Sequence, residues 1–180
     1  MLTSSDSKTT GYHVFLEPSG EAKLLLEKAI LSLATKCGGP LFSPHLTVLA
    51  AIPDDHESAL IEKARTLSLS MQSFTLNLGD FAMQDSYFRA LYLSATNQEV
   101  LEALHRDAQE LFGMRYSENY TPHVSLLYGH YPEEQKKASV ATLASLIPLS
   151  FSVSSLALWK TPGETSTWKR IAEFPFPIKV

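Results

Sequence analysis

Cysteine is almost absent from this sequence, in which Cys37 is the only one among 180 residues. A single thiol can form neither an intramolecular disulfide nor a cysteine-rich metal cluster. The sequence also lacks an apolar run long enough to span a bilayer, and residues 1–10 lack the basic start and apolar core of a secretory signal. These absences favour a cytoplasmic protein in a reducing compartment, with no membrane partner and a flexible N-terminus over residues 1–10.

Charged residues are sparse as well, at 19% of the chain, and the formal net charge is −4. Proteins that bind long nucleic acid need a basic face to neutralise its phosphates, so we expect no such partner. A small anionic substrate is compatible with this charge. The 44% of apolar residues can bury one sizeable core, so we expect residues 11–180 to form a single domain and the protein to be a monomer.

The sequence has no Gly-rich phosphate loop, no Walker motif and no Gly-x-Ser-x-Gly nucleophile elbow. It contains instead one seven-residue phrase twice, as Ser-Pro-His-Leu-Thr-Val-Leu at 43–49 and Thr-Pro-His-Val-Ser-Leu-Leu at 121–127. Both copies read hydroxyl, proline, histidine, aliphatic, hydroxyl, aliphatic, aliphatic. A lone histidine in a strand is more often structural than catalytic, but seven matched residue classes in two copies indicate a reaction centre with two similar halves.

Hydrophobic periodicity and Gly/Pro punctuation predict a repeating order of elements. We expect strands at 12–17, 41–52, 74–83, 87–95, 120–128, 151–158 and 167–174, and helices at 24–37, 53–69, 97–112 and 132–146. The second half of this order echoes the first. The sequence therefore predicts an α+β domain of two similar lobes, each a small, largely antiparallel sheet backed by helices, with the active site in the cleft between the lobes.

Each motif copy falls on an expected strand, where residues two apart share a face. His45 and Thr47 therefore point one way and their aliphatic neighbours the other, and His123 and Ser125 follow the same rule. The proline before each histidine favours extended geometry in the residue that precedes it. We predict two polar pairs, each held on a rigid apolar backing, facing each other across the cleft.

Imidazole titrates near neutral pH, so one histidine of a pair can accept a proton while the other donates one. Opening a cyclic phosphodiester needs such a pair, one to deprotonate water and one to protonate the departing oxygen, and the hydroxyls would stabilise charge on the non-bridging oxygens. The motifs therefore predict a phosphodiesterase. His13, His105 and His130 have no hydroxyl two residues later and no metal-ligand spacing, so we expect neither a metal nor a cofactor.

On these residues the chain resembles the two-histidine phosphoesterases, and among them the cyclic nucleotide phosphodiesterases that act on ADP-ribose 1″,2″-cyclic phosphate. The likeness includes the hairpin 88–93, His-Val-Ser-Leu-Leu-Tyr at 123–128, and the ending at 157–161 with Thr-Trp at 167–168. The resemblance implies metal-free hydrolysis of ADP-ribose 1″,2″-cyclic phosphate to ADP-ribose 1″-phosphate, and of nucleoside 2′,3′-cyclic phosphates to 2′-phosphates. It also suggests a role in clearing the products of tRNA splicing.

The resemblance assigns roles to the motif residues. His123 would be the general base for water, His45 the general acid for the leaving oxygen, and Thr47 and Ser125 the donors to the phosphate. Because the two copies are nearly equivalent in sequence, the base and the acid could be exchanged. Plant relatives carry several cysteines that can pair, whereas Cys37 stands alone, so redox control through disulfides is not expected here.

Three aromatic residues are candidate substrate contacts through the same resemblance. Tyr128 occupies the place where similar enzymes have an active-site tyrosine, but it falls on the strand face opposite to His123 unless the strand bends, so a structural role is an equal alternative. Phe88 and Trp168 lie where similar sequences have aromatic residues near the base pocket, and core packing is the alternative for both.

Two other functions compete with this interpretation. One is an RNA-end 2′,3′-cyclic phosphodiesterase of the same superfamily, which the few basic residues near the motifs disfavour. The other is a binding module that has kept the fold and lost catalysis, which the presence of both histidines and both hydroxyls disfavours. In each case the partner is a cyclic phosphate.

Overall fold

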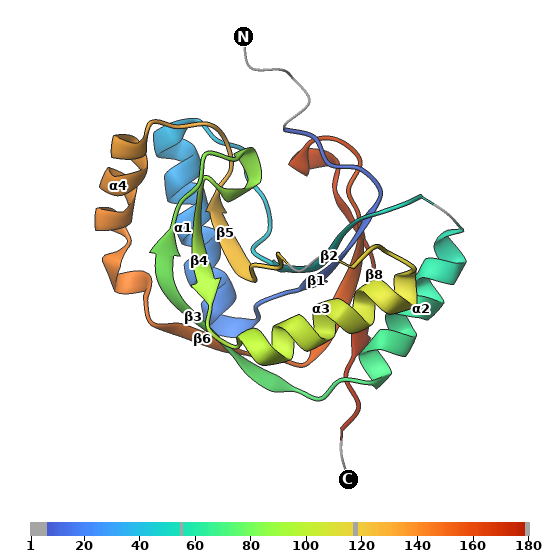
Figure 1. The fold of residues 1–180 in the computed structure, drawn as a ribbon. Coiled ribbons are helices and arrows are strands. Elements are labelled where there is room, and N and C mark those ends of the chain that lie inside the picture. Colours follow the sequence, from blue (N-terminus) through green and yellow to red (C-terminus); the bar gives the residue numbers. More distant parts are fainter. Residues whose placement is uncertain (1–6, 55, 117–118, 179–180) are drawn as a thin grey trace.

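The computed structural model describes residues 7–54, 56–116 and 119–178, which form one curved sheet with helices packed against it (Figure 1). The α+β class expected from the sequence is confirmed. The described elements are the strands β1 (Tyr12–Leu16), β2 (Leu46–Ile52), β3 (Phe74–Ala82), β4 (Leu91–Ala95), β5 (His123–Leu127), β6 (Leu149–Val153), β7 (Ser155–Lys160) and β8 (Lys169–Pro175), the helices α1 (Gly20–Cys37), α2 (Glu57–Leu69), α3 (Gln98–Phe112) and α4 (Glu133–Thr142), and 3-10 turns at Tyr87–Arg89, Ala144–Leu146 and Thr165–Thr167.

The two motif strands, β2 and β5, are neighbours at the centre of the sheet, whose order is β6-β3-β4-β5-β2-β1-β7-β8. A single antiparallel register pair, Leu46↔Val124, joins them. Four antiparallel strands lie on each side of this junction, so the two expected lobes are fused edge to edge. Because pairing stops after one position, the next residues of β2 and β5 are left to line a cavity.

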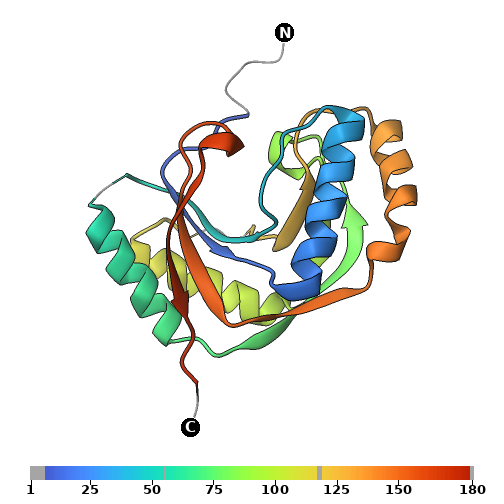
Figure 2. The same cartoon turned by 180° about the vertical axis from the view of Figure 1, so that it is seen from behind.

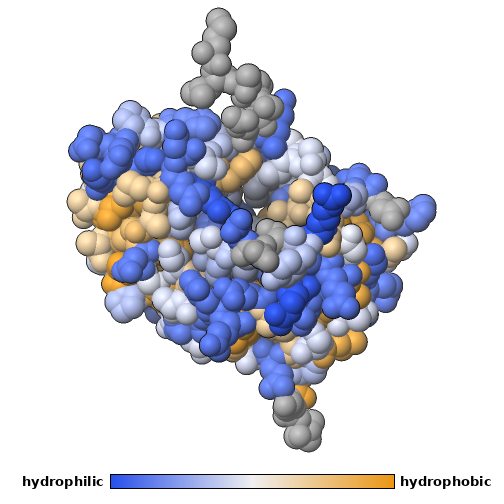
Figure 3. All heavy atoms as spheres, in the orientation of Figure 1, coloured by the Kyte–Doolittle hydropathy of each residue, from blue (hydrophilic) through white to orange (hydrophobic). Residues whose placement is uncertain are grey.

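Two helices pack against strands from the other half of the sequence. α1, from the first half of the chain, packs against β5, and α3, from the second half, packs against β2, while α2 lies on β7 and β8. Figure 2 shows α1 running alongside β5. Each motif strand is therefore backed by a helix from the other half of the sequence. Figure 3, in the orientation of Figure 1, shows many hydrophilic residues on this face, with patches of hydrophobic residues at its left and lower right.

Helix α1 illustrates how the sequence sets these packing faces. Leu26, Ile30 and Leu33 are spaced at one helical face and all are buried. The helix ends where Gly38 adopts a left-handed conformation with φ 77°, which glycine reaches without a Cβ penalty. The Gly38 amide then donates to the Ala34 carbonyl at 2.8 Å, which satisfies a carbonyl of the last turn.

Both motif strands begin later than the sequence suggested, at Leu46 and His123 rather than at residues 41 and 120. The proline of each motif has no N–H to donate to a strand partner, so regular pairing begins only after it. Within the strands, Val48 and Leu126 are 1% and 0% exposed. The apolar side of each motif is thus anchored in the core, as predicted.

The expected strand at 151–158 is wrong as a single element. β6 ends at Val153 and pairs with β3, whereas β7 begins at Ser155 and pairs with β1 and β8. The chain therefore passes from one lobe to the other at Ser154. Apolar residues continue on both sides of this position, so periodicity alone did not reveal the break.

Three other boundaries also differ. The first residues of the expected strand 87–95 form a 3-10 turn, Tyr87–Arg89, which is held to the end of the second motif by the Gly129 amide donating to the Tyr87 carbonyl at 2.8 Å. α2 begins at Glu57, and Asp54 lies before it in an ion pair with Lys160 at 3.0 Å, while residue 55 is outside the described residues. α4 ends at Thr142, and a 3-10 turn completes the expected span.

Of the N-terminal segment expected to be flexible, residues 1–6 lie outside the described part of the chain. Thr9 forms an isolated bridge with Gly163, in which the two backbone N–H···O distances are 3.1 and 2.8 Å. Among the described helices, none is long and apolar enough to cross a membrane.

Candidate active site

One cavity of about 270 Å³ brings together every site residue that the sequence predicted. The motif side chains reach it from the strands on either side of the short β2–β5 junction, and three aromatic residues close around them. The predicted residues that line it are His45, Thr47, Phe88, His123, Ser125, Tyr128 and Trp168. The unpredicted residues that line it are Thr9, His13, Phe15, Ala50 and Arg89.

The two motif histidines are held in the same way. The Nδ1–H of His45 donates to the Ser43 carbonyl at 2.6 Å, and the Nδ1–H of His123 donates to the Thr121 carbonyl at 2.7 Å. A carbonyl only accepts, so these contacts place the proton of each neutral imidazole on Nδ1 and the lone pair on Nε2. The proline between carbonyl and histidine keeps the first residue extended, which explains the recurrence of hydroxyl-Pro-His.

Burial keeps both imidazoles neutral in the free protein. The ring of His45 stacks on Phe15 at 3.9 Å between centroids and is 7% exposed. Burial lowers its pKa from 6.5 to about 4. Burial likewise lowers the pKa of His123 to about 4, opposed by its bond to the Thr121 carbonyl and reinforced by the positive charge of Arg89. Each Nε2 is therefore unprotonated in the free protein. Either imidazole can act as an acid only after it takes up a proton, and a bound anion would stabilise that protonated form.

The two motif hydroxyls are not equivalent. The Ser125 hydroxyl donates to the Phe88 carbonyl at 2.8 Å, so its proton is already engaged. For Thr47, the backbone carbonyl accepts a bond from the Tyr120 hydroxyl at 2.9 Å, and the side-chain hydroxyl has no hydrogen bond to a described residue. Only the Thr47 hydroxyl is thus free to donate to a ligand without losing a partner.

Tyr128 turns into the cavity because β5 ends at Leu127, one residue before it. Its hydroxyl lies 3.5 Å from Nε2 of His45, and its ring stacks on Phe42 at 3.8 Å between centroids. Burial raises the pKa of Tyr128, so the phenol stays protonated and can act as a donor. Phe88 meets the same ring edge-on at 5.1 Å. Tyr128 therefore lies on the cavity side, because the regular alternation of β5 ends one residue before it.

A family model described as the 2′-5′ RNA ligase superfamily matches residues 7–165. The chain belongs to this superfamily. The cyclic phosphodiesterase of Arabidopsis thaliana is 31% identical over 171 residues, which cover 89% of this chain and 92% of that protein. The resemblance to two-histidine phosphoesterases that the motifs indicated is confirmed.

Solved structures share the superfamily fold at low identity. TT0787 of Thermus thermophilus aligns with a TM-score of 0.64 at 15% identity, over 92% of this chain and 97% of that one. LigT of E. coli complexed with 3′-AMP aligns with a TM-score of 0.61 at 14% identity, over 95% of this chain and 100% of that one. These two likenesses support the fold alone.

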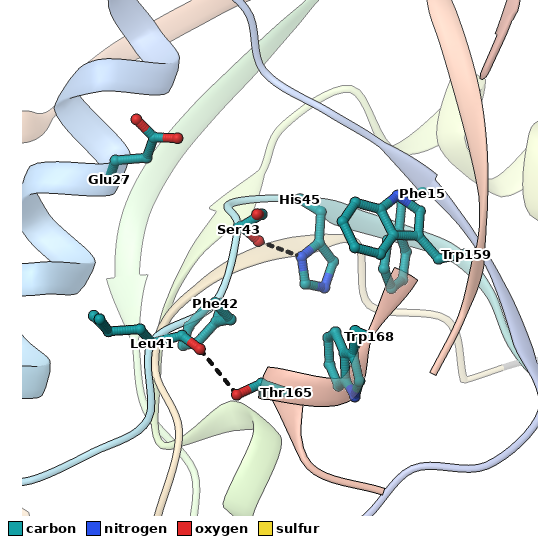
Figure 4. Close-up of a pocket in the computed structure, with 9 residues that line it drawn as sticks. All are labelled: Phe15, Glu27, Leu41, Phe42, Ser43, His45, Trp159, Thr165 and Trp168. Carbon is teal, nitrogen blue, oxygen red and sulfur yellow. Dashed lines mark hydrogen bonds between the residues drawn. The ribbon is translucent and has the colours of Figure 1, made fainter. Parts of the chain in front are cut away.

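A second cavity of about 330 Å³ adjoins the first in this superfamily member, because Phe15, His45 and Trp168 line both (Figure 4). Figure 4 shows the indole of Trp168 on one side of His45 and the rings of Phe42 and Phe15 on others. Trp168 meets His45 edge-on at 5.9 Å. The surroundings of His45 thus combine a proton-transfer group with flat apolar surfaces.

The loop that carries Trp168 is tied across this second cavity. The Thr165 hydroxyl donates to the Leu41 carbonyl at 2.9 Å, which joins the β7–β8 connection to the segment before the first motif (Figure 4). Trp159 and Glu27 complete the same walls. The arrangement offers aromatic surfaces and one carboxylate next to the reaction centre, which suits a planar ring that carries hydrogen-bond donors.

His13 lies in the first cavity although its sequence context carried no functional signal. Its Nδ1 lies 2.7 Å from the Thr161 hydroxyl, and its Nε2 accepts a bond from the Ala51 amide at 3.4 Å. Burial lowers its pKa to about 4. Because its Nε2 accepts from a backbone amide, which is fixed in place, His13 supports the wall of the cavity. The sequence also missed Phe15, whose contact with Thr47 follows from strand pairing and not from spacing along the chain.

Proposed function

We propose that this protein hydrolyses ADP-ribose 1″,2″-cyclic phosphate to ADP-ribose 1″-phosphate and nucleoside 2′,3′-cyclic phosphates to nucleoside 2′-phosphates, without a metal ion. Membership of the superfamily and the likeness to a curated cyclic phosphodiesterase support enzymatic hydrolysis of cyclic phosphodiesters in general. The observation that carries the finer proposal is the pair of Nε2 atoms, tethered alike through Nδ1, in one cavity. As part of it we propose a cytoplasmic monomer that clears cyclic phosphates left by tRNA splicing.

In the proposed reaction a water oxygen attacks phosphorus in line with the ring oxygen that departs. Nε2 of His123 takes a proton from the water as the new P–O bond forms, and Nε2 of His45 gives its proton to the departing oxygen as the old P–O bond breaks. The products are a phosphate monoester and a free hydroxyl. The proton gained by His123 then leaves to solvent, while His45 takes up a proton for the next cycle.

The different surroundings of the histidines support this assignment of base and acid. His123 is half-buried and open to water, whereas His45 is 7% exposed and packed against Phe15. A group that activates water needs access to water, and a group that protonates the leaving oxygen benefits from a dry site. The Tyr128 hydroxyl near Nε2 of His45 can donate to an oxygen of the same leaving group, and Thr47 can donate to a non-bridging oxygen.

The two adjoining cavities support a ribose-borne substrate rather than free pyrophosphate or a simple alkyl phosphate. The cyclic phosphate would lie among the motif residues in the first cavity, and an attached base would lie against Phe42 and Trp168 in the second. Stacking on such rings is sequence-tolerant, because every base has an aromatic face. This tolerance is consistent with action on several nucleosides.

Phosphorus NMR tests the proposal. Chelator-treated protein should convert both cyclic phosphates to the 1″- and 2′-monoesters, and His45→Ala or His123→Ala should each lower the rate by about 10²- to 10⁴-fold without loss of fold. His56→Ala is the matched control, because His56 is exposed, outside both cavities, and also followed by a hydroxyl two residues later. Wild-type turnover by either motif variant would refute the pair.

The same assay separates the two alternatives. Faster opening of an oligonucleotide that ends in a 2′,3′-cyclic phosphate than of the mononucleotide would favour the RNA-end function. Tight binding of the cyclic phosphate without ring opening would favour a binding module.

A further inference from the structure

We infer that Arg89 is a substrate-binding residue of this site, whose guanidinium binds the non-bridging oxygens of the phosphate on the His123 side of the cavity. The inference rests on the proposed function, because it deepens the account of how the same site holds a phosphate. It adds Arg89 to the phosphate donors that the motifs supply.

The engaged hydroxyl of Ser125 leaves a gap in the second half of the site. A hydroxyl has one proton, and that of Ser125 is donated to the Phe88 carbonyl at 2.8 Å. To donate to phosphate, Ser125 would have to release the Phe88 carbonyl, which lies in a half-buried turn. The first motif has no such conflict, because the Thr47 hydroxyl has no hydrogen bond to a described residue. A further donor beside His123 would therefore strengthen the hold on the phosphate.

Arg89 directly follows Phe88 and, among the residues that the structure describes, is the only formally charged side chain that lines the first cavity. In the described part of the chain, no carboxylate lines this cavity and Arg89 forms no ion pair. In a chain with a net charge of −4, a cation in a carboxylate-free wall indicates a site for an anion. The guanidinium is always charged, and its fork of donors matches two oxygens of one phosphate.

The backbone that carries Arg89 is fixed to the second motif. The Ser125 hydroxyl holds the Phe88 carbonyl, and the Gly129 amide holds the Tyr87 carbonyl at 2.8 Å. The Arg89 amide donates to the Ser86 carbonyl at 3.1 Å, which closes the 3-10 turn. In this arrangement Ser125 positions the turn, and Arg89 makes the contact. Preorganisation of this kind lowers the entropy lost when a ligand binds.

The charge of Arg89 also acts on His123, where it helps to keep the imidazole neutral. A neutral imidazole is the form that can accept a proton from water, so the cation that binds phosphate also keeps the general base ready. Removal of the charge should therefore weaken phosphate binding and raise the pKa of His123 together. Replacing a residue that only supports the wall would leave phosphate binding unchanged.

The test compares Arg89→Gln and Arg89→Lys with the wild type and with Arg106→Gln, a control at an exposed position of α3 outside both cavities. Calorimetry measures binding of a nucleoside 2′-monophosphate and of the same nucleoside without phosphate, at several salt concentrations. Arg89→Gln should weaken monophosphate binding by about ten- to a hundredfold and flatten its salt dependence, with nucleoside binding unchanged. Arg89→Lys should restore part of the affinity, and Arg106→Gln should match the wild type.

Imidazole NMR of the same variants gives a second readout. The titration midpoint of His123 should rise in Arg89→Gln and stay unchanged in Arg106→Gln. Folded Arg89→Gln protein with wild-type monophosphate affinity and an unchanged His123 midpoint would overturn the inference. These measurements do not depend on turnover. If the wild type binds the monophosphate through Arg89 but opens no cyclic phosphate, the proposed reaction fails and the anion site stands.

Discussion

Binding of a phosphate should raise the pKa of the motif histidines, and the size of this change can be worked out from the site. In the free protein, burial lowers the pKa of both His45 and His123 from 6.5 to about 4. For His45, which is 7% exposed, this lowering of the pKa corresponds to about 3 kcal/mol against the cation. At pH 7 only about one such imidazole in a thousand is then protonated.

A phosphate bound between the histidines opposes the effect of burial on their pKa values. An opposite charge within about 4–6 Å raises a pKa by about 1–3 units, so the midpoints should move from about 4 into the range of about 5–7. The free enzyme and the complex should therefore differ in their pH profiles. The acid limb of kcat/KM should lie near the low midpoints of the free protein, whereas the bell for kcat should be displaced toward neutral pH.

Proton–carbon correlation spectra of the imidazoles can measure these midpoints directly. Titrations from about pH 3.5 to 8 would follow His45 and His123, with and without a nucleoside 2′-monophosphate. The midpoints of both motif histidines should be low in the free protein and rise when the ligand binds. A midpoint near 6.5 for either histidine in the free protein would contradict this prediction, as would a bound monophosphate that moves neither midpoint.

The same shifts set the sign of the stability change with pH. A histidine whose folded pKa lies below its unfolded value of 6.5 takes up its proton first in the unfolded chain. The free energy of unfolding should therefore fall as the pH is lowered from about 6.5 to about 4, and it should change little above this window. Urea unfolding at several pH values would check the sign.

Three more outcomes are expected, two from contacts around the cavity and one from a reaction without a metal ion. Tyr120→Phe should lower the free energy of unfolding by about 0.5–1.5 kcal/mol in urea denaturation, because it removes the bond to the Thr47 carbonyl, and an unchanged midpoint would contradict this. Leu46→Ala should cost about 2–5 kcal/mol by the same measurement, because Leu46 is 0% exposed at the strand junction. Ring opening should survive prolonged chelation, and recovery of lost activity by an added divalent cation would refute the two-histidine mechanism.

The parts of this molecule that were predictable from the sequence are those with a local signal. The order of strands and helices follows from periodicity and from Gly and Pro, as at Gly38, where the helix stop has its own backbone requirement. The two motifs carry their own geometry, since the proline places a carbonyl where the following histidine needs a partner. Such features require no knowledge of distant parts of the chain.

The remaining residues of the site depend on distant contacts. Phe15 reaches His45 because β1 pairs with β2, and no spacing along the chain encodes that register. Arg89 enters the cavity because a 3-10 turn replaced the expected start of a strand, which periodicity could not distinguish. The crossover at Ser154 was hidden for a related reason, because both strands it joins are apolar.

The position of β7 in the sheet has a consequence for how the protein is made. β1 pairs with β7, and Tyr12 lies opposite Lys160, so the lobe that contains the first motif is incomplete until a strand near the end of the chain has been synthesised. Sheets dominated by such distant pairings fold slowly, because a long loop must close before any contact compensates the lost entropy. During translation, β1 therefore stays unpaired on the side that β7 later occupies. Activity should appear late in the folding of this sheet rather than early.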